Sequence, residues 1–288
     1  MSDACKQFLG LLRGKALFTQ GGLSLSEEIR ADFFVSIVSA YCFCYNVIAN
    51  QECVGKFMVK TFEKYETSFC IFLIIVYIVV NSVCIQNFGE ISGVGLIANA
   101  ILSVCLIVIM LLLKRTAYYG LKKVKNARQY LYFIPLFIIV TVNLWNGFNI
   151  THSSKEILLY ILTMINVGFT EEIIFRGFLF RMMAKSSINS AVIVSAVTFG
   201  MGHIVNLLNG AELIPTLMQV GYATATGYLF VIIFHKSKSL VPCIITHCLV
   251  NSLSIFNIEN TLSLYVAPVF LTVIPLAYGF YINRKIRE

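Results

Sequence analysis

Eight long apolar segments follow one another along the chain, and they decide what it can fold into. About 20 apolar residues in a helix are needed to cross the ~30 Å hydrocarbon core of a bilayer. Open-edged strands would leave backbone groups without hydrogen bonds in lipid, so these segments are expected to be helices. The sequence therefore predicts an all-α fold, a polytopic membrane bundle of about eight transmembrane helices. The segments lie at roughly 68–85, 94–113, 130–148, 156–175, 188–208, 212–234, 239–256 and 261–281.

The first 67 residues differ from the rest. Residues 1–32 carry both charge signs, and residues 33–49 form an apolar run that is short for a span and contains polar side chains. We interpret 33–49 as an interfacial or half-inserted segment, with a ninth span as the alternative. No cleavable signal peptide is evident. The predicted organisation is an N-terminal extension, 1–67, followed by a membrane domain, 68–288.

The basic residues indicate how the bundle is oriented. Six of them and no acid lie between the second and third segments, and further basic residues follow the fourth, sixth and eighth. Alternating spans place all of these on one side, which the positive-inside rule assigns to the cytoplasm. The sequence thus predicts a multi-pass integral membrane protein with a cytoplasmic C-terminus. The net charge of +8 comes from basic residues in these loops, which are expected to lie at the bilayer surface. No nucleic-acid partner is therefore expected.

Two adjacent carboxylates and an arginine interrupt an apolar part of a chain that is 58% hydrophobic and 12% charged. They are Glu171, Glu172 and Arg176. A charge at the bilayer centre costs ~2.5–3.5 kcal/mol on insertion scales, so such a residue marks a candidate functional site. Glu172 and Arg176 have the i, i+4 spacing of a helical ion pair. Glu171 points about 100° away around the helix and is left free to handle a proton.

Two histidines lie deep in other apolar segments. His203 follows Phe199 by one helical turn in an FxxxH arrangement, and His247 precedes Asn251 by one turn, so each pair shares a helix face. A single membrane histidine is often only a hydrogen-bonding residue between helices. Together with the glutamate pair, on three long segments, these residues predict one shared site.

Several hydrolase classes lack their motifs. The only aspartates, Asp3 and Asp32, precede the first apolar run, which excludes an aspartyl intramembrane protease. HExxH, GxSxG and Walker A sequences do not occur. The remaining chemistry is that of carboxylate and imidazole.

These groups can support hydrolysis by an activated water. Glu171 is placed to act as the general base, and His203 can hold the same water and carry its proton to the leaving amine. His247 and Asn251 can donate hydrogen bonds to a developing oxyanion, where one donor is typically worth ~3–4 kcal/mol of barrier. Glu172 and Arg176 would support the helix and the electrostatics.

The order EExxxR, FxxxH, HxxxN resembles the CPBP family, which comprises CAAX prenyl endopeptidases and bacteriocin-processing intramembrane proteases and is also called the Abi family. The run from Glu171 to Gly177 is close to the family's EExxFRG form, and Tyr119-Gly120-Leu121 resembles its (L/Y)GL element. The resemblance covers about 68–281 and implies an eight-helix fold. It leaves residues 1–67 unexplained.

The resemblance implies a role for each motif residue. Glu171 and His203 activate water, His247 and Asn251 form the oxyanion hole, and Glu172 and Arg176 support them, with Phe199 beside His203. The family has been described both as metalloprotease and as glutamate-type. Glu171 with His203 and His247 could ligate zinc. We expect no cofactor, because Asn251 suits an oxyanion hole better than a zinc site, and zinc stays the alternative.

Three functions therefore compete. The first is an intramembrane endopeptidase that cuts a CAAX-like tail or a bacteriocin- or pheromone-type peptide near the cytoplasmic membrane surface. The second is a catalytically inactive membrane scaffold or bacteriocin self-immunity protein, and the third is a proton-coupled transporter. The expected partners are the lipid bilayer and a peptide or lipidated-peptide substrate, and the oligomeric state stays open. A compact chain without eukaryotic targeting signals favours a bacterial cytoplasmic membrane.

Overall fold

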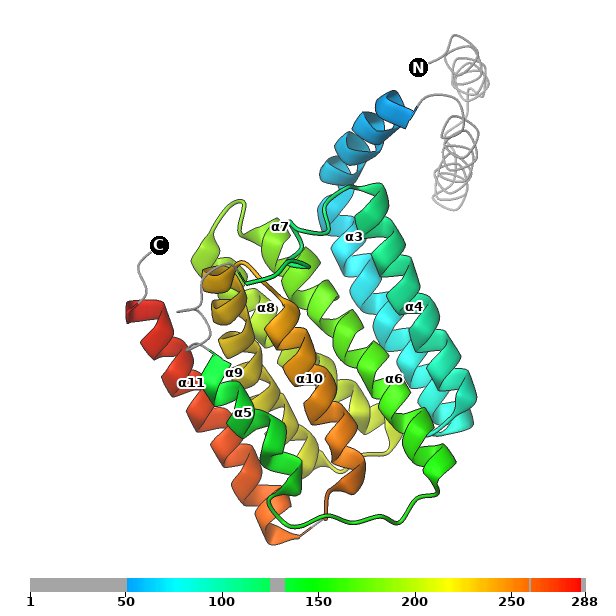
Figure 1. Ribbon diagram of the computed structural model, residues 1–288, viewed down its shortest axis with the longest axis vertical. Coiled ribbons are helices and arrows are strands. Elements are labelled where there is room, and N and C mark those ends of the chain that lie inside the picture. Colours follow the sequence, from blue (N-terminus) through cyan, green and yellow to red (C-terminus); the bar gives the residue numbers. More distant parts are fainter. Residues whose placement is uncertain (1–50, 125–132, 259, 286–288) are drawn as a thin grey trace, which may run out of the picture. The chain divides into compact units, whose positions relative to one another are not determined.

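Every regular element is a helix in the part of the chain that the computed structural model describes, residues 51–124, 133–258 and 260–285 (Figure 1). This confirms the all-α prediction. The α-helices are α3 (Gln51–Phe88), α4 (Gly93–Leu112), α5 (Ile134–Thr141), α6 (Ser154–Glu172), α7 (Arg181–Met183), α8 (Ile188–Gly202), α9 (Leu213–Ser237), α10 (Val241–Leu253) and α11 (Ala267–Lys285). Shorter 3-10 and π-helical turns extend them, namely η2 (Val142–Leu144), η3 (Ile173–Phe180), η4 (His203–Asn209), η5 (Ser254–Phe256) and η6 (Leu262–Val266).

The chain divides into two compact units, Met1–Tyr65 and Glu66–Glu288, and the second is the helix bundle. Helix α3 is kinked at Tyr65, whose φ of −112° and ψ of 16° are not helical. The apolar run 33–49 lies outside the described residues, so its placement at the interface or across the membrane stays a prediction. The division at residue 67 likewise stays a prediction.

Six helices of the described part are long and apolar enough to cross a membrane. They are Phe57–Phe88, Gly93–Leu112, Ser154–Met183, Ile188–Asn209, Leu213–Ser237 and Leu262–Lys285. The other two expected spans form shorter apolar helices, Ile134–Leu144 and Val241–Phe256. The third segment ends before the expected residue 148, because Gly147 takes a left-handed φ of 102° and Asn149 N–H donates to the Phe256 carbonyl. The bundle thus has about the expected number of helices, two of them shorter than a full span.

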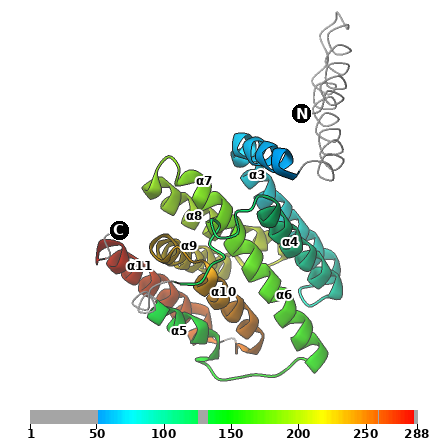
Figure 2. The ribbon, with the colours of Figure 1, turned by 45° about the horizontal axis from the view of Figure 1, so that its top comes forward.

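Successive helices run in opposite directions, so the turns between them gather at two ends of the bundle (Figures 1 and 2). We call the end with residues 113–124, 184–187 and 238–240 and the end of α11 the basic end. The turns 89–92, 145–153 and 210–212, with residues 257–258 and 260–261, form the opposite end. Helix α6 packs between α4 and α10, and α9 packs between α8 and α11.

The Tyr119-Gly120-Leu121 element closes the basic end. The Gly120 carbonyl accepts a 2.9 Å hydrogen bond from Leu240 N–H, just before α10 starts at Val241–Pro242. Gly120 has a φ of 92°, and a Cβ there would lie 2.5 Å from the Phe234 ring. A glycine is needed because the backbone is left-handed and the neighbouring helix approaches it directly.

Substituting Gly120→Ala should lower the free energy of unfolding by roughly 1–3 kcal/mol, from left-handed strain and overpacking. The matched control is Gly221→Ala in α9, where a Cβ would meet nothing within 4 Å. Thermal unfolding of both variants in detergent tests this, and equal melting temperatures would contradict the packing described here.

Candidate active site

The two adjacent glutamates end α6 at the point where the helix widens into the π-helical segment η3. Helix α6 begins with a capping box in which Ser153 and Glu156 bond each other's backbone N–H groups. From there it runs through η3 and α7 as one helix. Glu171 is 8% exposed and Glu172 is 0% exposed, so both carboxylates face the bundle interior. π-helical turns within α-helices occur frequently at functional sites.

Glu172 and Arg176 form the ion pair that their spacing predicts. Arg176 Nη1 lies 3.0 Å from Glu172 Oε1, and both side chains are fully buried. The guanidinium stacks over the Phe199 ring at 4.0 Å and lies 5.7 Å from the Phe230 ring. A Cβ on Gly227 of α9 would come within 2.9 Å of Arg176 Nη2. A buried arginine of this kind is stable only because its charge is paired and its flat face is covered by aromatic rings.

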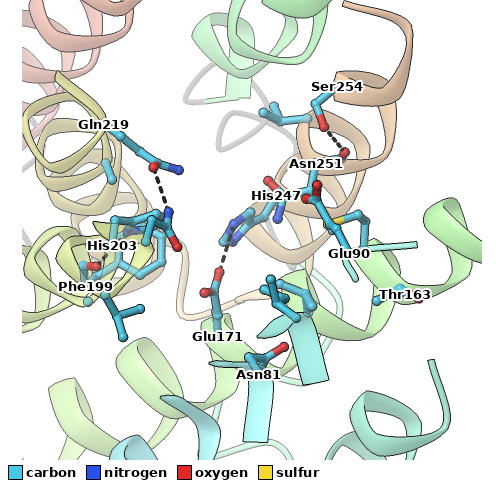
Figure 3. A pocket seen from close by; sticks show the side chains of 18 of the residues that line it. Asn81, Glu90, Thr163, Glu171, Phe199, His203, Gln219, His247, Asn251 and Ser254 are labelled. Atoms are coloured by element: carbon cyan, nitrogen blue, oxygen red, sulfur yellow. Dashed lines mark hydrogen bonds and ion pairs between the residues drawn. The ribbon is translucent and has the colours of Figure 1, made fainter. Parts of the chain in front are cut away.

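The imidazole of His247 lies between the two carboxylates. Its Nδ1 is 2.8 Å from Glu172 Oε1. Its Nε2 is 3.2 Å from Glu171 Oε2 (Figure 3). An Nδ1–H that donates to Glu172 fixes the ring and turns Nε2 toward Glu171. The sequence places His203, not His247, beside Glu171 as its catalytic partner. The structure instead makes His247 the histidine in direct contact with that carboxylate.

Tyr77 is the residue that the sequence reasoning missed. Its hydroxyl donates a 2.7 Å hydrogen bond to Glu171 Oε1 from α3, so both carboxylate oxygens of Glu171 are engaged. Tyr77 is one of 14 tyrosines and belongs to no motif that we identified. No local signal in the sequence could have distinguished it.

His203 and Asn251 line the same cavity without a direct hydrogen bond to Glu171 among the described residues. His203 starts η4, and its Nδ1 lies 3.1 Å from the Phe199 carbonyl, so its Nε2 is the nitrogen left for the cavity. Figure 3 shows His203 across the cavity from His247 and Asn251. The Asn251 backbone carbonyl accepts a 2.7 Å hydrogen bond from Ser254 Oγ. The expected residues thus meet around one space, as the motifs predict.

The space is a cavity of about 410 Å³. Glu171 and His247 line it together with Phe175, Phe199 and Phe230. The rest of the lining is rich in amide and hydroxyl groups, from Asn81, Asn99, Asn143, Tyr160, Asn206, Gln219, Asn251 and Ser254. Glu90 supplies a second carboxylate, and no lysine or arginine occurs among the described lining residues. The cavity therefore combines a negative charge with many hydrogen-bonding groups.

The arrangement does not fit a metal centre. Within the described residues no group of three histidine, cysteine, aspartate or glutamate side chains could hold a metal ion. The two nitrogens of His247 face two different carboxylates, so His247, Glu171 and Glu172 cannot converge on one ion. The alternative zinc set of Glu171, His203 and His247 is not assembled either.

Fold and site define a class, the polytopic helical membrane proteins with a glutamate–histidine site inside the bundle. Residues 153–253 match a family described as type II CAAX prenyl endopeptidase Rce1-like. This segment contains all three motifs, and the match confirms the resemblance to the CPBP family of intramembrane proteases. The family indicates an intramembrane CAAX-type protease at a coarse level. No curated protein and no solved structure matches the chain.

Removing one partner of the buried ion pair should destabilise the bundle strongly. Arg176→Met leaves the Glu172 charge buried with only His247 to balance it, and we expect a loss of about 3–5 kcal/mol of unfolding free energy. The double variant Arg176→Met with Glu172→Gln removes that charge and should recover part of the loss. Thermal unfolding in detergent measures both, and a double variant no more stable than the single one would show that the pair is not coupled.

Proposed function

We propose that the chain is an intramembrane endopeptidase in which Glu171 activates water to cleave a peptide bond. The observation that carries this proposal is the setting of Glu171, held by Tyr77 and His247 and lining a cavity large enough for a peptide segment. A carboxylate that is oriented by hydrogen bonds inside a largely water-excluded site is suited to general-base catalysis. An idle membrane scaffold has no physical need for such a group.

In the proposed reaction Glu171 accepts a proton from a water molecule, whose oxygen attacks the carbonyl carbon of the peptide bond. The carbonyl oxygen becomes negatively charged, and the side-chain amide of Asn251, which lines the same cavity, is the candidate donor to it on α10, because both ring nitrogens of His247 face carboxylates. The bond between carbon and nitrogen then breaks, and the amine leaves with the proton from Glu171 or through His203. If the Nδ1–H of His203 donates to the Phe199 carbonyl, Nε2 is an acceptor, which suits a group that holds water.

The carboxylates that line the cavity indicate where in a peptide the cleaved bond lies. With Glu90 and Glu171 in the cavity, and no lysine or arginine among its described residues, a free terminal carboxylate would meet like charge and no cation. This favours a bond inside a peptide over one close to a free C-terminus. Among the two substrate types compatible with the family, the plain bacteriocin- or pheromone-type peptide fits better than a short CAAX-like tail.

Glu171→Gln should abolish cleavage, with a fall in kcat of ~10²–10⁴-fold, because the amide cannot take a proton from water. The matched control is Glu90→Gln, which removes a carboxylate from the same cavity and should keep activity. Purified protein is incubated with prenylated and plain peptides that end in a carboxylate or a carboxamide, with and without chelator, and products are identified by mass spectrometry.

Unchanged cleavage by Glu171→Gln would remove the proposed mechanism. If the native protein cleaves nothing, an inactive scaffold or a transporter takes its place, and uptake driven by a pH gradient in proteoliposomes then separates those two. Chelator should have no effect on the cleavage rate, because the described residues do not assemble a metal centre.

Tyr77→Phe should lower kcat by about 10-fold or more and leave KM nearly unchanged, because a hydrogen bond to a charged group contributes ~1.5–3 kcal/mol. The control Tyr160→Phe removes another cavity hydroxyl, one that bonds Ser254 at 2.7 Å and not Glu171. Steady-state kinetics on both variants, with melting temperatures to confirm folding, test this. Equal kcat values for the two variants would show that Tyr77 does not position the base.

A further inference from the structure

We propose that the site is reached from the side of the membrane opposite the basic loops, so that its substrate is a peptide segment on the extracytoplasmic side. That this peptide segment is a substrate rests on the proposed function. The side of access does not, because it is a property of the cavity and of the loops and can be measured without catalysis.

Apart from Phe175 and Phe230, the cavity extends from Glu171 and His247 toward the opposite end of the bundle. Its described lining includes Gly89 and Glu90 in the turn between α3 and α4, and Asn209 at the last residue of η4. The turn after α3 and the end of η4, to which these residues belong, lie at the opposite end of the bundle (Figure 1). Lining residues from the other helices, such as Asn143, Tyr160 and Ser254, come from the same half of each helix.

Between the glutamate pair and the basic end, the interior around η3 and α9 is densely packed. A separate cavity of about 550 Å³ lies near the basic end between α5 and α10, and neither Glu171 nor His247 lines it. All eight residues of η3, Ile173–Phe180, are buried, and so is the run from Leu229 to His235 on α9. Phe180 packs on Phe234 with ring centroids 5.8 Å apart, and Tyr119 packs on Phe178 at 4.3 Å. Protein interiors are packed as densely as organic crystals, so such a layer leaves no passage for a peptide.

The charges of the two ends differ sharply. Among the described residues of the bundle, one lysine, Lys155, lies at the opposite end, with the acids Glu90, Glu156 and Glu212. The basic end carries Lys114, Arg115, Lys122, Lys123, Arg181, Lys185, Lys236, Lys238, Arg284 and Lys285. An excess of this size in short loops and helix ends is the signal that retains a loop in the cytoplasm.

Two expectations from the sequence are therefore incompatible with this cavity. Basic loops in the cytoplasm and entry of the substrate from the cytoplasm cannot both hold, because the cavity lining extends away from those loops. The charge difference between the two ends favours basic loops in the cytoplasm. A lipidated tail anchored in the cytoplasmic leaflet would then face the densely packed interior around η3 and α9, whereas an exported peptide would face the cavity and its carboxylates.

The experiment places single additional cysteines in the native chain and labels them with a membrane-impermeant maleimide. Glu90→Cys and Asn209→Cys report on the cavity mouth, and Asn81→Cys reports on the cavity interior. Lys123→Cys and Lys285→Cys report on the basic end, where both side chains are exposed. Right-side-out spheroplasts and inverted vesicles of a bacterial inner membrane are compared, with labelling normalised to denatured protein and the native chain as background.

We expect the three cavity variants to label at least ten-fold more in spheroplasts than in inverted vesicles, and the two basic-end variants to do the reverse. Cavity variants that label only in inverted vesicles would overturn the proposal by placing the site in the cytoplasm. If Asn81→Cys is labelled from the same side of the membrane as Lys123→Cys, and not from the side of Glu90→Cys, the cavity opens at the basic end and the proposal is wrong. The two mouth positions keep the test decisive if one variant fails to fold.

Catalysis is then read separately. A cleavable peptide added to intact spheroplasts should be cut by the native protein and spared by Glu171→Gln. If labelling shows an extracytoplasmic cavity and purified protein cuts no peptide, the proposed function fails while the side of access stands. If purified protein cuts peptides and labelling shows that the cavity is open to the cytoplasm, the proposed side of access fails while the proposed function stands.

Discussion

The structure depends on one carboxylate that is buried without access to water. Glu172 Oε1 lies 3.0 Å from Arg176 Nη1 and 2.8 Å from His247 Nδ1, so a single oxygen joins η3 to α10. Arg176 in turn stacks on Phe199 of α8 and lies against Gly227 of α9. A charge in this position is stable only if its partners stay in place, so the network holds four helix segments in one arrangement. That arrangement presents the remaining nitrogen of His247 to Glu171.

The same network divides the bundle into two halves of different character. Toward the basic end the interior around η3 consists of large buried side chains such as Phe178, Phe180 and Phe234, and the cavity near that end, between α5 and α10, does not include Glu171 or His247 in its lining. Toward the opposite end it is lined by amides, hydroxyls and carboxylates around about 410 Å³ of space. A hydrolytic site needs both: a dry, rigid support for its charged groups and a volume that admits a peptide and water. The proposed chemistry lies where the two halves meet.

Much of this could be predicted from local spacing. A run of apolar residues must form a helix in lipid, which explains why the helix count and most helix positions agree. The Glu172–Arg176 ion pair follows from an i, i+4 separation and needs no tertiary information. The convergence of Glu171, His203, His247 and Asn251 on one cavity was a stronger inference, because four polar side chains on three membrane helices are favourable only if they face each other or water.

The sequence by itself determined the helices, the buried ion pair and the four motif residues Glu171, His203, His247 and Asn251 that meet at the cavity, because each follows from periodicity along one segment or from the polarity of a side chain in lipid. Only the tertiary structure decided the contacts between segments. Tyr77 reaches Glu171 across 94 positions and His247 reaches Glu172 across 75, and such pairings depend on how helices rotate and pack. The direction in which the cavity opens is decided the same way, by where large side chains fill the bundle and where small polar ones leave it hollow.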